Sequence, residues 1–206
     1  MIFCHTPREA KMILRAFLML LVLTVPILAI EDENKPVLVI IKTEKGEIEI
    51  ELDAKNAPNT TANFLRYVDA KHYETGRFHR TVTANNQPDN TAKIEVIQAG
   101  VPIAKEKDTF PAIKLERTRY TKLTHKDGTI SMARDGPDTA TSDFFICVGD
   151  QPELDFGGKR NPDGQGFAAF GRVVKGMDVV RTIQKSTADG QALKPPIMIQ
   201  SITRKK

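Results

Sequence analysis

Short apolar segments, separated by polar stretches rich in turn-forming residues, run through most of this chain and limit the folds open to it. Residues 47–52 alternate strictly between Glu and an aliphatic residue, which predicts a β-strand with one buried and one solvated face. The β-branched segment 37–43 precedes it, and Gly46 lies between them, so the two are expected to form a hairpin. Similar apolar segments predict strands at 76–82, 94–98, 129–133, 144–148, 167–174 and 196–203.

Two segments instead show helical spacing. Residues 57–70 place Pro58 in a first turn, where proline is tolerated, followed by Phe64, Leu65 and Val68 on one face. A shorter helix is expected at 177–184. The polar stretches 83–93, 101–126 and 150–166 are expected to be surface connections. Many strands with two helices predict a mostly β fold, an antiparallel sandwich or barrel with the helices outside.

Composition narrows the class of protein. A length of 206 residues suits one domain, and the net charge of +4 is too small for a nucleic-acid-binding surface. Part of that charge lies at the extreme N-terminus, and nothing in the chain demands more than a monomer. Cys4 and Cys147 are the only cysteines, which excludes a disulfide framework. Cys147 lies in an apolar segment and is expected to be a buried thiol.

The N-terminal segment has the layout of an export signal. Arg8, Lys11 and Arg15 precede an uncharged apolar run, residues 16–30, which is followed at once by acidic residues. The run is short for the roughly 30 Å membrane core, and Pro26 interrupts it. We expect residues 1–29 to be a signal peptide, 30–36 a linker and 37–206 the folded domain of an exported, periplasmic protein. An uncleaved segment anchored in the inner membrane stays open as the alternative.

Common catalytic templates are absent. The chain has no phosphate loop, no dinucleotide fingerprint and no histidines at metal-binding spacing, so we expect neither a metal nor an organic cofactor. The unusual residues are Arg80 and Gln98, polar side chains at the ends of apolar segments. If Phe78 points inward, the period of two residues sends Arg80 to the same side. A buried salt bridge and a role in a functional site are both open for this arginine.

A set of segments, in this order along the chain, resembles cyclophilin-type peptidyl-prolyl isomerases. They are 57–64, Phe78-His79-Arg80, Val96-Ile97-Gln98-Ala99-Gly100, 128–133, 141–146, Leu154-Asp155 and 170–180. The chain is therefore similar to a divergent, exported bacterial member of that family. The resemblance implies a closed eight-stranded antiparallel barrel with two capping helices. It also implies catalysis of rotation about X-Pro bonds in exported or unfolded proteins, with proline-containing peptides and unfolded chains as partners.

The resemblance assigns roles to individual residues. Arg80 matches the catalytic arginine of the family, and Gln98 matches a glutamine that holds a substrate carbonyl. The expected wall of the proline pocket consists of Phe145, Leu154, Val96 and Phe167. Ala133 matches a backbone position that contacts the residue before proline.

Departures from the family pattern leave a second function open. Glu95, Asp143 and Glu153 stand where the family has phenylalanine, glutamine and, in many members, tryptophan. A carboxylate beside Arg80 would turn the guanidinium away from substrate. The alternative is therefore a catalytically weak or inactive proline-peptide-binding or chaperone module. A shift of one residue in the alignment would instead place Ile94 or Val96 in the pocket.

An insertion relative to typical members lies within 83–93. It is polar and is expected to form an exposed turn near the mouth of the groove, where it would shape substrate choice. A neutral surface insertion is the other interpretation.

Overall fold

The computed structural model describes residue 1 and residues 36–205. The signal peptide or anchor expected at 1–29 and the linker expected at 30–36 lie, except for their end residues Met1 and Pro36, outside the described residues. Cys4 lies outside them as well. From residue 36 onward the chain forms one compact unit.

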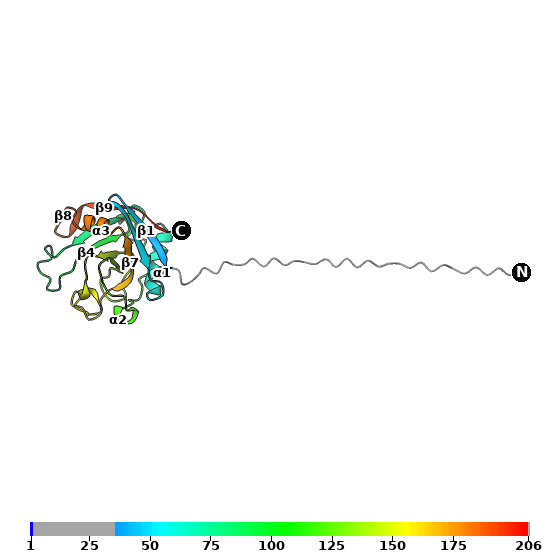
Figure 1. Cartoon of the computed structure of the whole chain (residues 1–206), viewed down its shortest axis with the longest axis horizontal. Coiled ribbons are helices and arrows are strands. Elements are labelled where there is room, and N and C mark those ends of the chain that lie inside the picture. Colours follow the sequence, from blue (N-terminus) through cyan, green and yellow to red (C-terminus); the bar gives the residue numbers. More distant parts are fainter. Residues whose placement is uncertain (2–35, 206) are drawn as a thin grey trace. The chain divides into compact units, whose positions relative to one another are not determined.

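Strands and helices alternate irregularly along this unit (Figure 1). The strands are β1 Val37–Thr43, β2 Gly46–Leu52, β3 Arg77–Val82, β4 Val96–Gly100, β5 Thr129–Met132, β6 Phe144–Cys147, β7 Ala168–Lys175, β8 Ala188–Asp189 and β9 Ala192–Arg204. The α-helices are α1 Pro58–Asp69, α2 Thr118–Thr121 and α3 Met177–Gln184, and short 3-10 turns cover Ile103–Lys105 and Pro152–Leu154. The expected strands and the two longer helices are confirmed. The single-turn α2, the 3-10 turns and the two-residue β8 were not foreseen, because such short elements show no periodicity.

The strands close into a barrel. Their order is β1-β2-β7-β5-β6-β4-β3-β9-β8, and an additional pairing of β1 with β9 joins the two sides, so that eight strands form the closed barrel and β8 extends it beyond β9. The ladders are antiparallel, as in the register Val39↔Ile50 of the first hairpin. The predicted closed eight-stranded antiparallel barrel is thus confirmed. Helix α3 packs against β2, β3 and β4, and α1 packs against β7 and β9.

Alternating side chains give the barrel two apolar clusters. Ile97 on β4 and Phe144 on β6 belong to the main cluster, which fills the interior. Their neighbours Val96 and Phe145 belong to a smaller cluster on the opposite face of the same strands. Cys147 also lies in the smaller cluster, fully buried as expected, and burial raises the pKa of its thiol well above the usual value. This smaller cluster, called the outer cluster below, also contains Leu154 and Phe167, which cover the outside of the barrel wall at this point.

A β-bulge in β3 overturns one sequence expectation. Phe78 pairs with Ala99, and Arg80 pairs with Gln98, so two steps on β3 oppose one step on β4. The extra residue, His79, breaks the period of two. Phe78 therefore lies in the interior cluster, whereas Arg80 lies on the outer face with Gln98. The prediction that both share one side was wrong, and the bulge is the reason.

The start of β4 also differs from the expected range 94–98. The backbone N–H groups of Ile94 and Glu95 donate to the side chains of Gln87 and Gln151 at 3.3 and 3.1 Å instead of entering the ladder with β3. Regular pairing with β3 begins at Val96, which opposes Val82. Side chains thus hold the backbone of the two residues that follow the insertion.

Candidate active site

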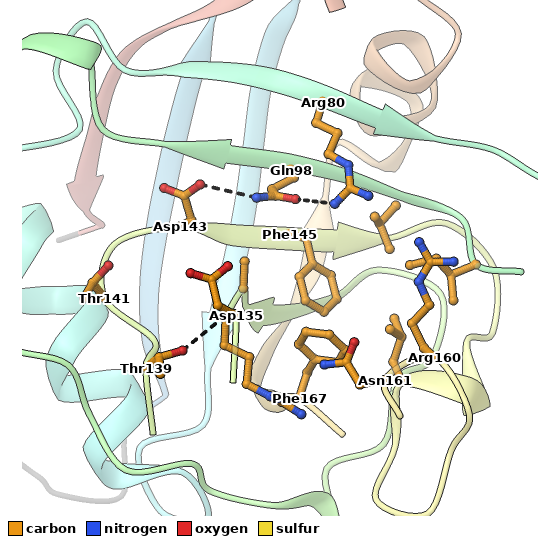
Figure 2. A pocket seen from close by; sticks show the side chains of 15 residues that line it. Arg80, Gln98, Asp135, Thr139, Thr141, Asp143, Phe145, Arg160, Asn161 and Phe167 are labelled. Carbon is orange, nitrogen blue, oxygen red and sulfur yellow. Dashed lines mark hydrogen bonds between the residues drawn. The ribbon is translucent and has the colours of Figure 1, made fainter. Parts of the chain in front are cut away.

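A cavity of about 370 Å³ opens over the outer cluster (Figure 2). Its lining includes every residue that the sequence assigned to the site: Arg80, Gln98, Phe145, Leu154, Val96, Ala133 and Phe167. The structure therefore brings together residues from β3, β4 and β6, from the position immediately before β7, and from the intervening loops. The lining also includes Asp143, one of the acidic departures, and Ile94, the alternative pocket residue. Further lining residues, which were not assigned to the site from the sequence, are Arg134, Asp135, Thr139, Thr141, Arg160 and Asn161.

The floor of the cavity is apolar and rigid. The rings of Phe145 and Phe167 meet edge to face with centroids 5.4 Å apart, and Leu154 beside them is 1% exposed. Behind Phe145, the ring of His125 stacks at 5.9 Å between centroids. Most of the residues that line the whole cavity are polar, but this aromatic and aliphatic floor suits a small apolar ring such as that of proline.

His125 belongs to an arrangement that superficially suggests a hydrolase. Its Nδ1 lies 2.7 Å from an Asp155 carboxylate oxygen, and its Nε2 lies 3.0 Å from the Ser131 hydroxyl. Ser131 is 0% exposed and His125 is 1% exposed, and neither lines the cavity. A nucleophile must reach its substrate, so these residues serve to hold the ring beneath Phe145 rather than to attack a bond.

Arg80 is held by amide oxygens rather than by carboxylates. Its Nη1 donates to Oε1 of Gln98 at 2.9 Å, and its Nε and Nη2 donate to Oε1 of Gln191 at 2.9 and 2.6 Å. Among residues 36–205, no carboxylate lies within ion-pair distance of this guanidinium. The salt bridge left open for Arg80 is therefore not formed in the described part of the chain.

This arrangement leaves the guanidinium able to donate into the cavity. A guanidinium carries five N–H donors, and Arg80 uses three of them in these bonds. The remaining two belong to the terminal nitrogens. Burial lowers the pKa of Arg80 from its usual value, yet a guanidinium stays charged at every physiological pH. The site thus presents an oriented positive charge above an apolar hollow.

Gln191 is a residue that the sequence gave no reason to select. It immediately precedes β9 and lies 111 positions from Arg80 along the chain. Its Nε2 donates to the backbone oxygen of Asn86, within the 83–93 insertion, at 3.0 Å. Asn86 in turn donates to the backbone oxygens of Thr81 and Gly190, both at 3.0 Å. The insertion therefore braces the residues on both sides of the Arg80–Gln191 contact.

The insertion is less exposed than predicted. Gln87 is only 2% exposed and donates to the backbone oxygens of Thr83 and Ile94 at 2.8 and 2.6 Å. Its Oε1 accepts from Nη1 of Arg160 at 2.7 Å. The expectation of an exposed turn was thus wrong at Gln87, because a polar side chain supplies the centre of the loop in place of an apolar one. Arg160 lines the cavity, so the insertion does lie beside it.

Of the acidic departures, only Asp143 lies in the cavity. Its Oδ2 accepts from Nε2 of Gln98 at 3.3 Å and lies 3.7 Å from Nε2 of His79. Burial raises the pKa of Asp143, and burial lowers the pKa of His79. Gly100 provides the space for this carboxylate, since a Cβ there would overlap it. Asp143 thus contacts Gln98 and not Arg80.

Glu95 and Glu153 lie outside the cavity. Glu95 accepts a hydrogen bond from Gln184 of α3 at 2.9 Å, while its neighbours Ile94 and Val96 line the cavity. Glu153 accepts from the backbone N–H of Lys159 at 2.8 Å. The prediction that Glu95 lies at a pocket position was therefore wrong, and Ile94 and Val96 line the cavity on either side of it.

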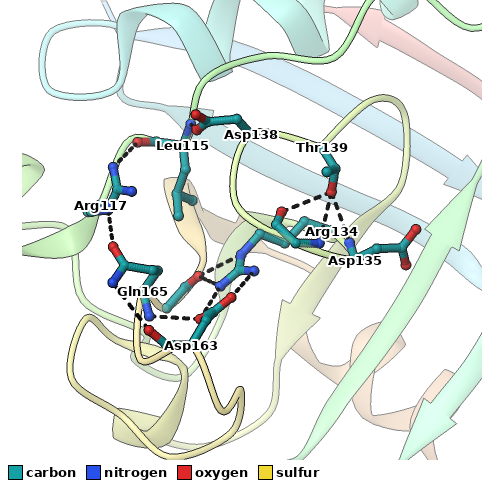
Figure 3. Close-up of polar contacts among 10 residues, drawn as sticks. Leu115, Arg117, Arg134, Asp135, Asp138, Thr139, Asp163 and Gln165 are labelled. Carbon is teal, nitrogen blue, oxygen red and sulfur yellow. Dashed lines mark hydrogen bonds and ion pairs between the residues drawn. The ribbon is translucent and has the colours of Figure 1, made fainter.

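Arg134 lines the cavity, and Figure 3 shows its polar contacts with Asp163. Its side chain is 1% exposed and donates to both carboxylate oxygens of Asp163 and to the backbone oxygen of Gly166. The guanidinium also lies 4.9 Å from the centroid of the Phe167 ring. Its charge is thus compensated by Asp163, and it fixes the loop that carries Phe167.

Within residues 36–205, no three His, Cys, Asp or Glu side chains are grouped so that they could hold a metal ion. Nor does any helix in that range have the length and apolar character needed to cross a membrane.

Comparison with known proteins identifies the family. The model of the cyclophilin type peptidyl-prolyl cis-trans isomerases matches residues 38–204. Peptidyl-prolyl cis-trans isomerase A of Dickeya dadantii is 36% identical over 171 residues, covering 79% of this chain and 82% of its own. Peptidyl-prolyl cis-trans isomerase B of Escherichia coli is 35% identical over 175 residues, covering 81% of this chain and 98% of its own.

Solved structures agree on the fold. A cyclophilin of Cryptosporidium parvum superposes with a TM-score of 0.68 at 23% identity, covering 84% of this chain and 99% of its own. A second structure of that protein, obtained in the presence of the dipeptide Ala-Pro, gives a TM-score of 0.67. With the family model matched from β1 to β9, the chain belongs to the cyclophilin-type peptidyl-prolyl cis-trans isomerases and is an isomerase enzyme of that family.

Proposed function

We propose that this isomerase acts on proline-containing segments of unfolded, exported chains, with Arg80 as the catalytic donor and Gln98 holding a substrate carbonyl. The proline ring would rest on Phe145, Leu154 and Phe167, with Val96 completing the wall. Ala133 would meet the residue before proline through its backbone. The observation that carries this proposal is the position of the Arg80 guanidinium, held by two amide oxygens at the edge of an apolar hollow.

The chemistry needs no covalent step. Rotation about an X-Pro bond passes through a twisted amide, with a barrier of about 18–20 kcal/mol, because conjugation between nitrogen and carbonyl is lost. In that twisted state the prolyl nitrogen regains a lone pair that can accept a hydrogen bond. A guanidinium donor aimed at this nitrogen binds the transition state better than the planar ground state, and so lowers the barrier.

The required reduction in the activation free energy is modest. A rise from roughly 0.01 per second to roughly 10 per second corresponds to about 4 kcal/mol. One charged hydrogen bond contributes about 1.5–3 kcal/mol, and fixing the proline ring in an apolar hollow supplies the rest. One charged hydrogen bond to the prolyl nitrogen is needed, and Arg80 has two unused N–H groups that can donate it.

The alternative of a weak or inactive binding module rests on one contact. Gln98 accepts from Arg80 through Oε1 and donates to Asp143 through Nε2, so part of its capacity to hold a substrate carbonyl is already used. Such a module would bind proline peptides in the same hollow with little acceleration. A measured rate of isomerisation distinguishes such a module from an active isomerase.

The deciding experiment compares Arg80→Ala with Arg172→Ala. Arg172 lies outside the cavity and pairs with Glu51 at 3.1 Å, so it controls for loss of a positive charge. Isomerisation of a short Ala-Pro peptide is measured by NMR exchange, and peptide affinity is measured alongside. We expect Arg80→Ala to lower the rate about a hundredfold with little change in affinity, as for other preorganised donors. An unchanged rate in a folded Arg80→Ala variant would overturn the role of Arg80.

Export is tested separately. The basic residues and apolar run at the N-terminus support it. The mass of the protein recovered from the periplasm should correspond to loss of about the first 29 residues. Recovery of the full-length chain in the membrane fraction would favour the anchored form instead.

A further inference from the structure

The cavity carries opposite charges on its two sides. Figure 2 shows Asp143 and Asp135 on one side of Phe145 and Arg160 on the other, with Arg80 above the rings. The third arginine in the lining, Arg134, is compensated by Asp163. The uncompensated positive charge of the cavity therefore comes from Arg80 and Arg160.

Arg160 has a charge without an ionic partner in the described chain. Its Nη1 donates to Oε1 of Gln87 at 2.7 Å and to the backbone oxygen of Ala92 at 3.1 Å, both in the 83–93 insertion. Within residues 36–205 no carboxylate lies within ion-pair distance of it. Neutral acceptors thus fix one nitrogen and leave Nε and Nη2 available to a ligand.

The environment of Arg160 favours an incoming anion. The side chain is half-buried, and both its burial and the nearby charge of Arg80 lower its pKa. Two guanidinium groups close enough to repel each other attract a carboxylate more strongly than either does alone. A carboxylate placed there would also form a hydrogen bond with a charged donor.

The direction of the bound peptide follows from the proposed function, on which this inference rests. If the residue before proline lies against the Ala133 backbone, the peptide enters past Asp135 and Asp143. The residues after the proline then leave past Leu154 towards Arg160. We propose that Arg160 is a specificity-determining residue that selects X-Pro segments with an acidic side chain immediately after the proline.

The test compares three peptides that differ only after the proline, Ala-Ala-Pro-Ala, Ala-Ala-Pro-Glu and Ala-Ala-Pro-Lys, each capped at both ends. For the unmodified protein we expect kcat/KM for the Glu peptide to exceed that for the Lys peptide about fivefold, the scale of one partly screened ion pair. The difference should shrink as salt is added, because salt screens the charges.

Variants assign the preference to Arg160. Arg160→Gln should bring the Glu and Lys peptides to the same kcat/KM, Arg160→Glu should favour the Lys peptide, and Arg160→Lys should keep the original order. Lys159→Gln removes a neighbouring charge that does not line the cavity and should change nothing. Arg160→Lys retains the charge even if its bond to Gln87 is lost, so it separates charge from loop structure.

Each failure has a different meaning. If the Ala peptide is not accelerated at all, the proposed function fails. If the Ala peptide is accelerated but Glu and Lys are treated alike, the proposed function stands and this inference is overturned. A preference of the unmodified protein for the Lys peptide over the Glu peptide would likewise overturn it.

Discussion

The side-chain oxygen of Gln191 accepts two hydrogen bonds from Arg80, from Nε at 2.9 Å and from Nη2 at 2.6 Å. Gln98 holds the remaining terminal nitrogen at 2.9 Å. The guanidinium plane is therefore set from both sides by neutral groups. A neutral acceptor orients the arginine without cancelling its charge, which a carboxylate in the same place would do.

Gln191→Leu is expected to lower kcat about tenfold or more and to leave KM nearly unchanged. The substitution removes the acceptor that orients Arg80, while the apolar hollow that binds the proline ring stays intact. Gln191→Glu restores an acceptor but sets a carboxylate against Arg80, so kcat should stay low. Peptide isomerisation over a range of substrate concentrations measures both parameters.

A matched control is available in the same fold. Gln165 accepts a hydrogen bond from Nε of Arg117 at 2.6 Å, and neither residue lines the cavity. Gln165→Leu therefore removes the same kind of contact elsewhere and should leave kcat unchanged. If Gln191→Leu and Gln165→Leu behave alike, Gln191 does not position the catalytic group.

Asp143→Asn is expected to raise kcat about threefold. The ionised carboxylate lies beside Gln98, and its negative charge lowers the positive potential that Arg80 creates at the prolyl nitrogen. The amide keeps a hydrogen-bond acceptor for Gln98 without the charge. Asp135→Asn, which changes the other carboxylate of the cavity, is the control. A rate unaffected by Asp143→Asn would show that the acidic departure does not restrain turnover.

The same substitution has a predicted pH signature in stability. Burial raises the pKa of Asp143 above its usual 3.8, so the folded state favours the protonated carboxyl. The contribution of this group to stability is fully present below pH 3.8 and is lost as pH rises through the raised pKa. Asp143→Asn should therefore stabilise the protein at neutral pH, and urea unfolding should show the gain disappearing in acid. A gain that is the same at both pH values would contradict the raised pKa.

The sequence predicted the wall of the site better than its polar geometry. The resemblance to the family placed Phe145, Leu154 and Val96 in the pocket wall, and the short segments that carry that resemblance are local in the sequence. The outward turn of Arg80 was not predictable, because the bulge at His79 has neither a Gly nor a Pro to mark it. The barrel pairing that opposes Arg80 to Gln98 fixes it instead.

Residues that act through tertiary contacts left no local signal. Gln191 is a single glutamine in a polar turn and meets Arg80 only because β9 pairs with β3. Arg160 belongs to a loop without periodicity, and its link to Gln87 joins two such loops. Both residues reach the site only through contacts made once the barrel has closed. The sequence therefore indicates the family motifs that carry Arg80 and Gln98, but not the side chains that orient Arg80 or that lie beside it.

The first helix offers a test of stability away from the site. No side chain of its own caps the start of α1. The Glu116 carboxylate instead accepts hydrogen bonds from the backbone and side chain of Asn59 at 3.1 and 3.0 Å, and from those of Thr60 at 2.8 and 2.6 Å. A residue distant in sequence thus supplies both the cap and the negative charge favoured at a helix N-terminus.

Glu116→Ala should lower the free energy of unfolding by about 1–2 kcal/mol, the usual cost of losing a helix cap. Glu116→Gln keeps an acceptor oxygen and should lose less. Glu74→Ala is the control, because Glu74 makes only a surface pair with Lys71 at 3.7 Å, and such pairs contribute little. Urea unfolding at neutral pH measures all of them. Equal losses for Glu116→Ala and Glu74→Ala would show that the helix start is satisfied by solvent, whereas a larger loss at Glu116 with unchanged isomerase activity would place its role in the fold alone.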